Sequence, residues 1–476
     1  MSKKKILISA DHGLAITYFL QSDLVPALLD AGLDVVVLVD DGLKEKIAQT
    51  FGRPGLTVEG LRLQQARDYF QKERNSLQWW LDFYRRAGAS RRMNLEAVDS
   101  YVRWVEHEAP PRRRALLPLT RLALNLLRAS RPARRALVNS QTRFTPDFYE
   151  DLFDRHQPDL LLSSTSGWRL DRYILRAAAR RGLPTAAIVQ GWDNPSSYTL
   201  PGAPVSQITC WSEVQKRELV EGSDWDPERI HIGGIPSYDG YFRREWVMPR
   251  EEYFRLHGLD PERRLLSYAC SFITYSPNIQ NIEALIRLMQ AGRLSAPSQL
   301  LIRLHPNHFT DNPLFAGERE QVRKLAREIP HVHMVEPLPL GGDMGYYSGE
   351  DMPEKSSMMA HSDVFLTVYS TMVVETSIHG TPIVAVTIDS PGGWPNRFTL
   401  PLTEIGGWPT HSRFRESGAG RVASNEEDLC QAINTYLETP DIDREAQQAF
   451  IRRECTYTDG SAGRRTAEWV LRRVGG

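Results

Sequence analysis

The chain has 476 residues, and its 58 basic and 59 acidic side chains leave a formal net charge of −1. This balance argues against the strongly basic surface of a nucleic-acid-binding protein, and the length allows two or three domains with a large core. The four cysteines are widely spaced and form no CxxC pair, which argues against a disulfide framework or a zinc site and favours a reducing compartment.

The N-terminus reads MSKKKILISADHG, with lysines ahead of an apolar run. This run is only five residues long before Asp11, which is too short for the apolar core of a signal peptide. No window of the sequence approaches the roughly 20 apolar residues that span a bilayer. We therefore expect a cytoplasmic protein and leave open a peripheral contact with the inner face of the plasma membrane.

Short apolar runs alternate with helical patterns from the N-terminus onward. KILISA, an amphipathic stretch from about Tyr18 to Ala31, and DVVVLVD form a strand, a helix and a strand of α/β type. Later runs of the same kind are DLLLSS (159–164), TAAIVQG (185–191), QITCWS (207–212) and RIHIGG (229–234). Because helices separate these fully apolar runs, they predict a parallel sheet that is buried on both faces.

A second series of strands begins after the polar segment MPREEYFRLHGLDPERR. Its apolar runs are LLSYACS (265–271), QLLIRLHP (299–306), VHMVE (332–336), DVFLTV (363–368) and PIVAVTID (382–389). We predict an α/β protein with two Rossmann-like domains, at about 1–245 and 246–440. The segment 441–476 has a helical pattern and is expected to pack across both domains.

Residues 65–150 interrupt this alternation with helical, aromatic and basic sequence inside the first domain. From Pro111 to Arg135 there are eight arginines and no acid, and Arg114, Arg121 and Arg128 recur every seven residues. Beside them stand Leu117, Leu124 and Leu127. The pattern is typical of a helix that binds an anionic membrane surface through its arginines. It also fits an inserted helix that packs its leucines on the domain and leaves solvated arginines outside.

In the second domain, two hydroxyls follow a buried run. Ser370 and Thr371 come directly after DVFLTVY, where a helical segment begins. Helix N–H groups and the helix dipole favour a phosphate at such a junction. Glu375 lies about one and a half turns further on, where its carboxylate can accept hydrogen bonds from the hydroxyls of a ribose. The alternative is a plain serine cap followed by a structural glutamate.

Arg303 and His305 form a second polar cluster, at the end of QLLIRLHP. A guanidinium and an imidazole at the carboxyl end of a strand suit a pyrophosphate, and especially a departing one. A lone histidine at a strand end is more often structural. Two phosphate-suited clusters at strand ends of one domain nevertheless favour a nucleotide site.

The segment SDVFLTVYSTMVVETSIHGTPIVAV resembles the donor-binding segment of GT-B glycosyltransferases. The similarity is greatest to the branch with bacterial surface-carbohydrate transferases and CDP-glycerol-dependent polyol-phosphate transferases. RLHP is similar to the HP element of that branch. ITCWSEVQKREL and IHIGGIPSYDGYF resemble the stretch in which such enzymes leave their first domain. The resemblance covers about 155–395 and does not extend to the helical insert.

This resemblance implies two domains that face a cleft, a nucleotide-sugar donor, and a cell-surface glycan or lipid-linked acceptor. The donor site would consist of Ser271, Arg303, His305, Ser370, Thr371 and Glu375. Within it, the hydroxyls and Glu375 would hold the diphosphate and the ribose, and His305 with Arg303 would stabilise the leaving phosphate. No metal and no other cofactor is expected, because cationic groups and the helix dipole would replace Mg²⁺.

An inverting transferase also requires a base that takes the proton of the acceptor hydroxyl. Two candidates follow strands of the first domain, His12 after ILISA and Asp193 after TAAIVQG. The polyol-phosphate transferases carry a histidine in a Trp-His-Gly context, whereas this chain reads QGWDNPSS, so both candidates stay open. Ser164, Ser166 and Asn194 are expected to contact the acceptor.

Three alternatives to a sugar transferase remain. The first is a polyol-phosphate transferase with a CDP-linked donor. The second is a non-hydrolysing UDP-sugar 2-epimerase, which shares the fold and the serine-to-acid spacing but is shorter and has no arginine-rich insert. The third is an inactive, membrane-docked scaffold, against which the joint presence of the predicted donor-site residues argues. No nucleic-acid partner is expected.

Overall fold

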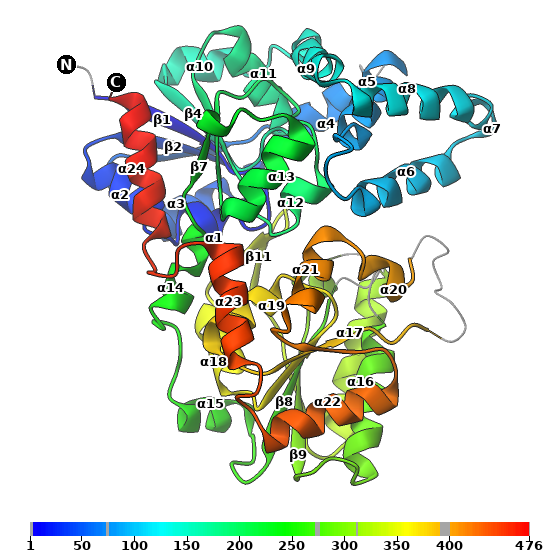
Figure 1. Ribbon diagram of the computed structural model, residues 1–476. Coiled ribbons are helices and arrows are strands. Elements are labelled where there is room, and N and C mark those ends of the chain that lie inside the picture. Colours follow the sequence, from blue (N-terminus) through cyan, green and yellow to red (C-terminus); the bar gives the residue numbers. More distant parts are fainter. Residues whose placement is uncertain (1–2, 73–75, 272–276, 311–312, 391–399, 476) are drawn as a thin grey trace. The chain divides into compact units, whose positions relative to one another are not determined.

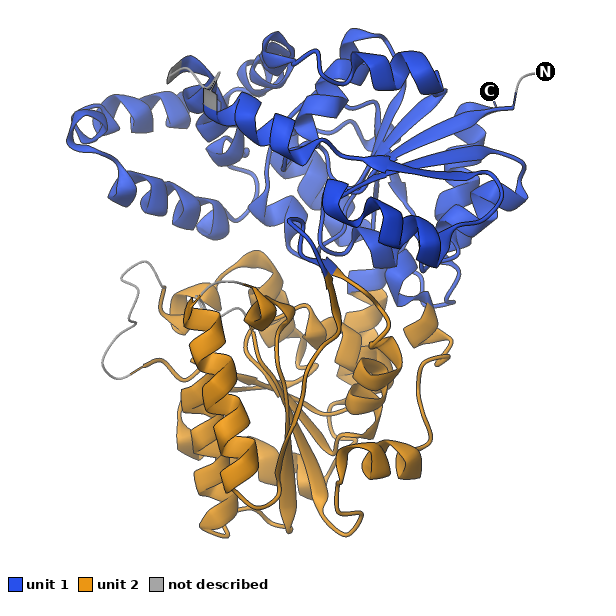
Figure 2. Cartoon of the chain, turned by 180° about the vertical axis from the view of Figure 1, so that it is seen from behind, with its two compact units in different colours: residues 1–239, 341–346, 454–476 blue, residues 240–340, 347–453 orange. Residues whose placement is uncertain are grey.

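The computed structural model describes residues 3–475 except 73–75, 272–276, 311–312 and 391–399. The chain divides into two compact units (Figure 2). Unit 1 comprises residues 1–239, 341–346 and 454–476, and unit 2 comprises residues 240–340 and 347–453.

Unit 1 is built on a seven-stranded parallel sheet with the order β3-β2-β1-β4-β5-β6-β7 (Figure 1). Its strands are β1 (Lys5–Ser9), β2 (Asp34–Val39), β3 (Leu56–Gly60), β4 (Leu160–Ser163), β5 (Thr185–Ile188), β6 (Gln207–Cys210) and β7 (Ile230–Ile232). The central strands β4 and β5 are buried along their whole length, as their uninterrupted apolar sequences require.

Unit 2 contains a six-stranded parallel sheet with the order β10-β9-β8-β13-β14-β15. Its strands are β8 (Arg264–Ala269), β9 (Ser298–Arg303), β10 (Val332–Val335), β13 (Val364–Thr367), β14 (Ile383–Val386) and β15 (Arg421–Ala423). Strands β11 (Pro339–Gly341) and β12 (Tyr346–Tyr347) form a separate two-stranded sheet. The two parallel α/β sheets confirm the predicted fold class.

Helices connect the strands of both sheets. In unit 1 they include α1 (Ala15–Phe19), α2 (Leu24–Asp30), α3 (Lys44–Phe51), α10 (Glu150–His156), α11 (Arg172–Arg180), α12 (Asn194–Ser197), α13 (Glu213–Ser223) and α24 (Ala462–Val474). The helices in unit 2 or at its ends are α14 (Asp239–Phe242), α15 (Arg250–His257), α16 (Asn278–Gln290), α17 (Pro313–Glu328), α18 (Met352–His361), α19 (Met372–His379), α20 (Leu402–Ile405), α21 (Pro409–Ser417), α22 (Glu426–Glu438) and α23 (Arg444–Cys455). Short 3-10 turns are η1 (Asp41–Leu43), η2 (Gln141–Phe144), η3 (Pro227–Arg229), η4 (Pro236–Tyr238) and η5 (Pro306–Phe309).

The amphipathic stretch from Tyr18 to Ala31 is not one helix, because the chain breaks between α1 and α2. At the break, the Ser22 hydroxyl donates to the carbonyl of Tyr18 (2.5 Å) and accepts from the N–H of Leu24 (3.2 Å). A serine side chain that binds nearby backbone groups competes with helix hydrogen bonds, and this explains the interruption.

The helical insert between β3 and β4 consists of α4 (Leu63–Lys72), α5 (Ser76–Ala87), α6 (Glu96–Glu108), α7 (Pro111–Arg114), α8 (Leu117–Ala129) and α9 (Arg131–Ser140). Figures 1 and 2 show α6, α7 and α8 projecting from the rest of unit 1 as a hairpin with α7 at its tip. A small apolar cluster of Phe83, Ala87, Val102 and Leu124 holds α5, α6 and α8 together.

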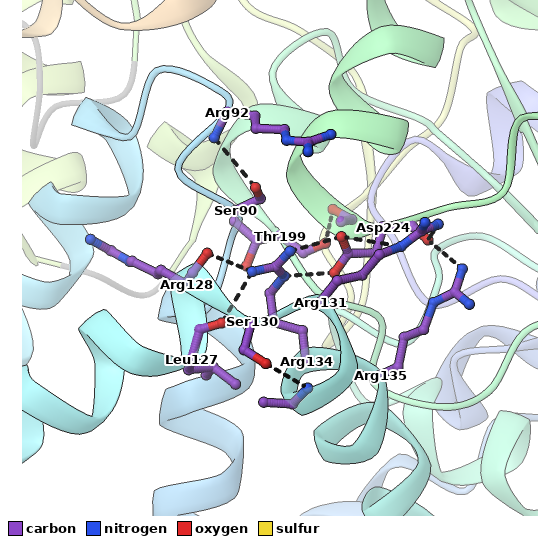
Figure 3. A network of polar contacts seen from close by, with 12 residues as sticks. Ser90, Arg92, Leu127, Arg128, Ser130, Arg131, Arg134, Arg135, Thr199 and Asp224 are labelled. Carbon is purple, nitrogen blue, oxygen red and sulfur yellow. Dashed lines mark hydrogen bonds and ion pairs between the residues drawn. The ribbon is translucent and has the colours of Figure 1, made fainter.

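Arg134 ties the base of this insert to the rest of unit 1 (Figure 3). Its buried guanidinium forms a bidentate ion pair with Asp224, with Nε–Oδ2 at 2.6 Å and Nη2–Oδ1 at 2.8 Å. Its Nη1 donates to the carbonyls of Leu127 (3.1 Å) and Arg128 (2.5 Å) at the C-terminal end of α8. One cation therefore balances a buried acid and the free carbonyls of a helix end.

We expect Arg134→Met to lower the free energy of unfolding by about 3 kcal/mol, because it leaves the nearly buried carboxylate of Asp224 with only a longer contact, 3.8 Å, to Nε of the exposed Arg131. Urea denaturation measures this loss. The control is Arg135→Met one residue later, where an exposed arginine pairs with the half-exposed Asp226 at 2.6 Å. That change should cost less than about 1 kcal/mol. Equal losses in the two variants would contradict the anchoring role of Arg134.

Candidate active site

The carboxyl ends of three adjacent strands of unit 2 carry most of the predicted donor-site residues. Strands β9, β8 and β13 are parallel neighbours, so their carboxyl ends lie on one edge of the sheet. His305 follows β9, Ser271 follows β8, and Ser370 and Thr371 follow β13. Residues 272–276, which continue the loop after Ser271, lie outside the described part of the chain.

His305 presents a hydrogen-bond donor at this edge. Its Nδ1 accepts from the N–H of Asn307 (3.1 Å), so the ring proton of the neutral imidazole resides on Nε2. Burial lowers the pKa of His305 to about 3, with smaller contributions from His308 and from the positive charges of Lys355 and Arg303. The imidazole is therefore neutral at physiological pH and can donate from Nε2.

A buried polar network fixes the loops after β8 and β9. The N–H of His305 donates to Nδ1 of His308 (2.9 Å), whose Nε2 lies 2.7 Å from Oε1 of Glu318. Asn278 donates to the same carboxylate oxygen (2.7 Å) and accepts from the N–H of Ser271 (3.1 Å). This network was not predictable from the sequence, because its members come from four separate segments of the chain.

Glu375 lies in the first turn of α19 and is buried. Its Oε2 accepts from the hydroxyl of Tyr241 (3.2 Å) and lies 2.5 Å from Nζ of Lys355. At the start of the same helix, the Ser370 hydroxyl accepts from the N–H of Met372 (3.3 Å). Burial, with the charge of Glu375, raises the pKa of Tyr241 well above its usual range, so this phenol remains a donor.

Lys355 and Tyr241 are site residues that the sequence analysis missed. Lys355 is partly buried on α18, and its positive charge helps to lower the pKa of His305. Tyr241 belongs to α14, 134 residues away from Glu375. The only signal in the sequence was a lysine within the acidic start of MPEKSSMMAH, which does not reveal a partner so distant in the chain.

Arg303 does not present a free guanidinium at the strand end, and this corrects the expectation that it contacts phosphate directly. It is buried, and its two Nη groups bind Asp351 and Glu354, at the start of α18. Tyr253 donates to the other oxygen of Glu354 (3.0 Å). Two carboxylates thus neutralise Arg303, and the ion pairs brace β9 against the helix that carries Lys355.

The pH dependence of stability tests the buried, neutral state of His305. Below the unfolded pKa of about 6.5 and above the folded pKa of about 3, only the unfolded chain binds the proton. His305 therefore destabilises the fold as the pH falls below 6.5. We expect His305→Asn to remove this penalty, so that its free energy of unfolding, relative to the parent protein, rises by up to about 1.4 kcal/mol per pH unit.

Urea denaturation at pH 7.5 and pH 5 measures this effect. The asparagine side chain can still accept from the N–H of Asn307, so the loop keeps its cap. A difference between variant and parent that is the same at both pH values would contradict a histidine held neutral.

Unit 1 also gathers polar residues at the carboxyl ends of adjacent strands, β1 and β4. Asp11 is buried after β1 and accepts from the N–H of Asp171 (2.6 Å) and from Nε of Arg169 (3.4 Å). Asp171 accepts from the hydroxyls of Ser163 and Thr165, each at 2.7 Å. Burial, reinforced by the nearby Asp11, raises the pKa of Asp171 to about 7. Neither Arg169 nor Asp171 was predicted to belong to this site, whereas Asp11 directly precedes the candidate base His12.

The two candidate bases differ in their surroundings. Nδ1 of His12 accepts from the N–H of Leu14 (3.1 Å), and burial, with the charge of Arg169, lowers the pKa of His12 to about 3. Asp193 is partly exposed before α12 and accepts from the Ser197 hydroxyl (3.0 Å). Burial raises the pKa of Asp193. The structure therefore favours Asp193, because the lone pair of His12 is already engaged.

The predicted acceptor-side residues lie after β4 and β5. Ser164 and Ser166 are buried, and their hydroxyls lack a hydrogen-bond partner among the described residues. The side-chain amide of Gln190 is buried after β5 and also lacks a partner within that part of the chain. Asn194 is held differently, because its Oδ1 accepts from the N–H of Gly191 (2.6 Å). Neutral polar groups thus gather on two neighbouring strands.

A distant segment completes this edge of unit 1. Residues 341–346 belong to unit 1, although they follow β10 of unit 2 in the sequence. The hydroxyl of Tyr346 donates to the carbonyl of Ala10 (2.6 Å) and accepts from the N–H of Asp40 (3.1 Å). Because Ala10 and Asp40 directly follow β1 and β2, this tyrosine fixes the ends of both strands.

No family model and no curated protein matches this chain. A solved UDP-GlcNAc 2-epimerase from Neisseria meningitidis, bound to UDP-GlcNAc, is similar with a TM-score of 0.53, 12% identity and coverage of 98% of this chain and 100% of that one. A glycosyltransferase from Rickettsia africae is similar with a TM-score of 0.52, 10% identity and coverage of 100% and 99%. The chain has the GT-B fold.

The described part of this GT-B chain contains no group of three or more histidine, cysteine, aspartate or glutamate side chains placed to hold a metal ion. No helix within the same residues combines the length and the apolar character needed to cross a membrane. Of the predicted donor-site residues, Ser271, His305, Ser370, Thr371 and Glu375 belong to the sheet edge of unit 2, and Arg303 lies behind it.

The arginines predicted to face a membrane are engaged within the GT-B chain. Arg128 is buried, pairs with Asp99 at 2.7 Å and donates to the carbonyl of Ala87, so the prediction is wrong for this residue. Arg121 forms an ion pair with Glu106 (2.6 Å). Arg114 donates to two backbone carbonyls at the end of α6 and just after it. The three arginines at this spacing therefore bind neighbouring elements of the insert, Arg114 from α7 and Arg121 and Arg128 from α8.

Proposed function

We propose that this protein is a glycosyltransferase that takes a sugar from a nucleotide-activated donor. The acceptor would be a cell-surface glycan or a lipid-linked precursor. The observation that carries the proposal is the sheet edge of unit 2, where an imidazole donor, two hydroxyls at a helix start and Glu375 gather beside Lys355. The solved UDP-GlcNAc 2-epimerase with this fold, which is bound to UDP-GlcNAc, supports a nucleotide-sugar donor.

In this proposal, unit 2 holds the donor by its nucleotide. The N–H groups at the start of α19, together with Ser370 and Thr371, bind the diphosphate, whose charge the helix dipole favours. Glu375 accepts hydrogen bonds from the ribose hydroxyls. As the sugar leaves, Nε2–H of His305 and the ammonium group of Lys355 stabilise the negative charge that develops on the departing phosphate.

The carboxyl edge of unit 1 supplies the acceptor site and the base. Asp193 accepts the proton of the acceptor hydroxyl as that oxygen attacks the anomeric carbon. The bond from that carbon to the phosphate oxygen breaks, and the nucleotide leaves as a diphosphate. Ser164, Ser166 and Gln190 provide neutral donors and acceptors of the kind that sugar hydroxyls require.

A nucleotide screen tests the donor assignment. We expect one of CMP, CDP, UDP and GDP to raise the melting temperature of the protein without added metal and in the presence of EDTA. A ligand at 100 times its dissociation constant adds about 2.7 kcal/mol of stability. A CDP response with no transfer of a sugar would favour the polyol-phosphate transferase. The absence of any nucleotide response would contradict the proposal.

An epimerase is the second candidate, because solved UDP-GlcNAc 2-epimerases share the fold over nearly the whole chain. The two candidates differ in their need for an acceptor. Incubation with UDP-GlcNAc alone, followed by chromatography of the nucleotide sugars, separates them. Formation of the 2-epimer without acceptor would replace the transferase proposal.

A further inference from the structure

Helix α8 carries a row of leucines that the other described residues of unit 1 leave exposed. Leu119, Leu122 and Leu126 are 65%, 58% and 63% exposed, and Leu116 precedes them at 44%. Their spacing of three or four residues places them on one face of the helix. The opposite face carries Leu124 and Arg128, both buried. Helix α8 is thus apolar on two sides, and packing among the residues that the structure describes accounts for only one of them.

This leucine face (Leu116, Leu119, Leu122 and Leu126) lies on the projecting hairpin of the insert. In both Figure 1 and Figure 2, α8 runs along the outer part of unit 1, well away from its sheet. Large exposed apolar residues also occur on the neighbouring helices of the insert, namely Leu77 on α5 and Trp104 on α6. Apolar patches of this kind mark a surface that binds a partner.

The charge of the insert indicates which partner fits. Residues 63–146 contain 17 arginines and lysines but seven acidic residues, in a chain whose net charge is −1. Residues 109–146, which include α8, contain nine arginines and no acidic residue. Arg112 and Arg114 are exposed on α7, immediately before the leucine face begins. Arg131, Arg134 and Arg135 pair with Asp224 and Asp226, which lie outside this range, and even with these two acids the insert keeps an excess of positive charge.

We propose that the leucine face of α8 docks on the surface of an anionic lipid bilayer. The leucines would enter the boundary between headgroups and acyl chains, while the arginines that flank them would meet lipid phosphates. A second copy of the chain fits less well, because it would bring two positively charged surfaces together. In this proposal the leucines contact the apolar part of the bilayer. The prediction from the sequence instead placed the membrane contact at Arg114, Arg121 and Arg128.

Vesicle sedimentation tests this proposal on the full-length protein. We expect binding to vesicles that contain phosphatidylglycerol, with weaker binding to pure phosphatidylcholine and at high salt. The triple variant Leu119→Ser, Leu122→Ser and Leu126→Ser should lose at least 100-fold in its partition coefficient, since burial of each leucine contributes roughly tenfold or more. The matched control is Leu256→Ser, Leu314→Ser and Leu338→Ser, which changes three similarly exposed leucines of unit 2. This control should bind like the parent protein.

Two further measurements keep the outcome unambiguous. Circular dichroism and nucleotide-induced thermal stabilisation should be the same in the triple variant and the parent, so lost binding does not reflect lost folding or a failed donor site. Sedimentation velocity without lipid reports self-association. If the α8 variant dissociates a dimer but keeps vesicle binding, or if parent and variant bind vesicles equally, the proposal is overturned.

Discussion

Glu375→Gln is expected to lower the affinity for the donor nucleotide about 100-fold while the protein remains folded. The glutamine has the same shape and can still accept from the hydroxyl of Tyr241, but it loses the charge that strengthens two hydrogen bonds from a ribose. Hydrogen bonds to a charged group contribute about 1.5–3 kcal/mol each, and the expected loss corresponds to about 2.7 kcal/mol. Isothermal titration calorimetry with the nucleotide identified in the screen measures this change.

The ion pair of Glu375 with Lys355 requires its own control, because Glu375→Gln leaves a partly buried ammonium group unpaired. That loss should cost about 1 kcal/mol of stability. The double variant Glu375→Gln with Lys355→Gln removes both charges, so stability should recover while nucleotide affinity stays low. An unchanged nucleotide affinity in the single variant would show that Glu375 serves packing alone.

Asp193→Asn is expected to lower the turnover rate about 1,000-fold without changing the affinity for the donor. General-base catalysis contributes about 10²- to 10⁴-fold, and an amide cannot take the proton of the acceptor hydroxyl. Because burial raises the pKa of Asp193 above its ordinary value of 3.8, activity of the parent protein should fall as the pH drops through that raised value. The residual activity of the variant should lack this acid limb.

His12→Asn is the matched control for Asp193, since both residues follow strands of the same sheet. It should lower turnover less than tenfold, because Nδ1 of His12 is bound to the N–H of Leu14 and its pKa is about 3. A loss of turnover in His12→Asn as large as that in Asp193→Asn would reverse the assignment of the base.

The apolar strands were predictable because an uninterrupted apolar sequence indicates by itself that a strand is buried on both faces. DVVVLVD, DLLLSS and DVFLTV need no partner to be recognised as strands of a covered parallel sheet. Strands β3 and β15 were missed, because they lie at sheet edges and their residues are mostly only partly buried. The residues that end a parallel strand were also predictable as a group, since such ends meet at one edge of the sheet.

The partners of charged residues were not predictable in the same way. Arg134 and Asp224 are 90 residues apart, and Tyr241 and Glu375 are 134 apart. A local pattern gives no information about contacts of this range. The arginines of α8 were therefore predicted to form a membrane-binding surface, although Arg128 is buried. The exposed leucines looked like ordinary helix sequence, because only the structure shows which of two apolar faces is covered.

The last helix has a consequence for biosynthesis. Asp239 accepts hydrogen bonds from the N–H groups of Ala462 (2.9 Å) and Gly463 (2.8 Å), and Trp469 of α24 is buried in unit 1. A ribosome therefore releases every residue of unit 2 before it releases the helix that completes unit 1. Unit 1, whose sheet is translated first, therefore cannot complete its packing until α24 has been made, whereas all residues of unit 2 are translated before that helix. A stop codon shortly before Ala462 should thus destabilise unit 1, although unit 1 is mostly translated first, and leave unit 2 folded.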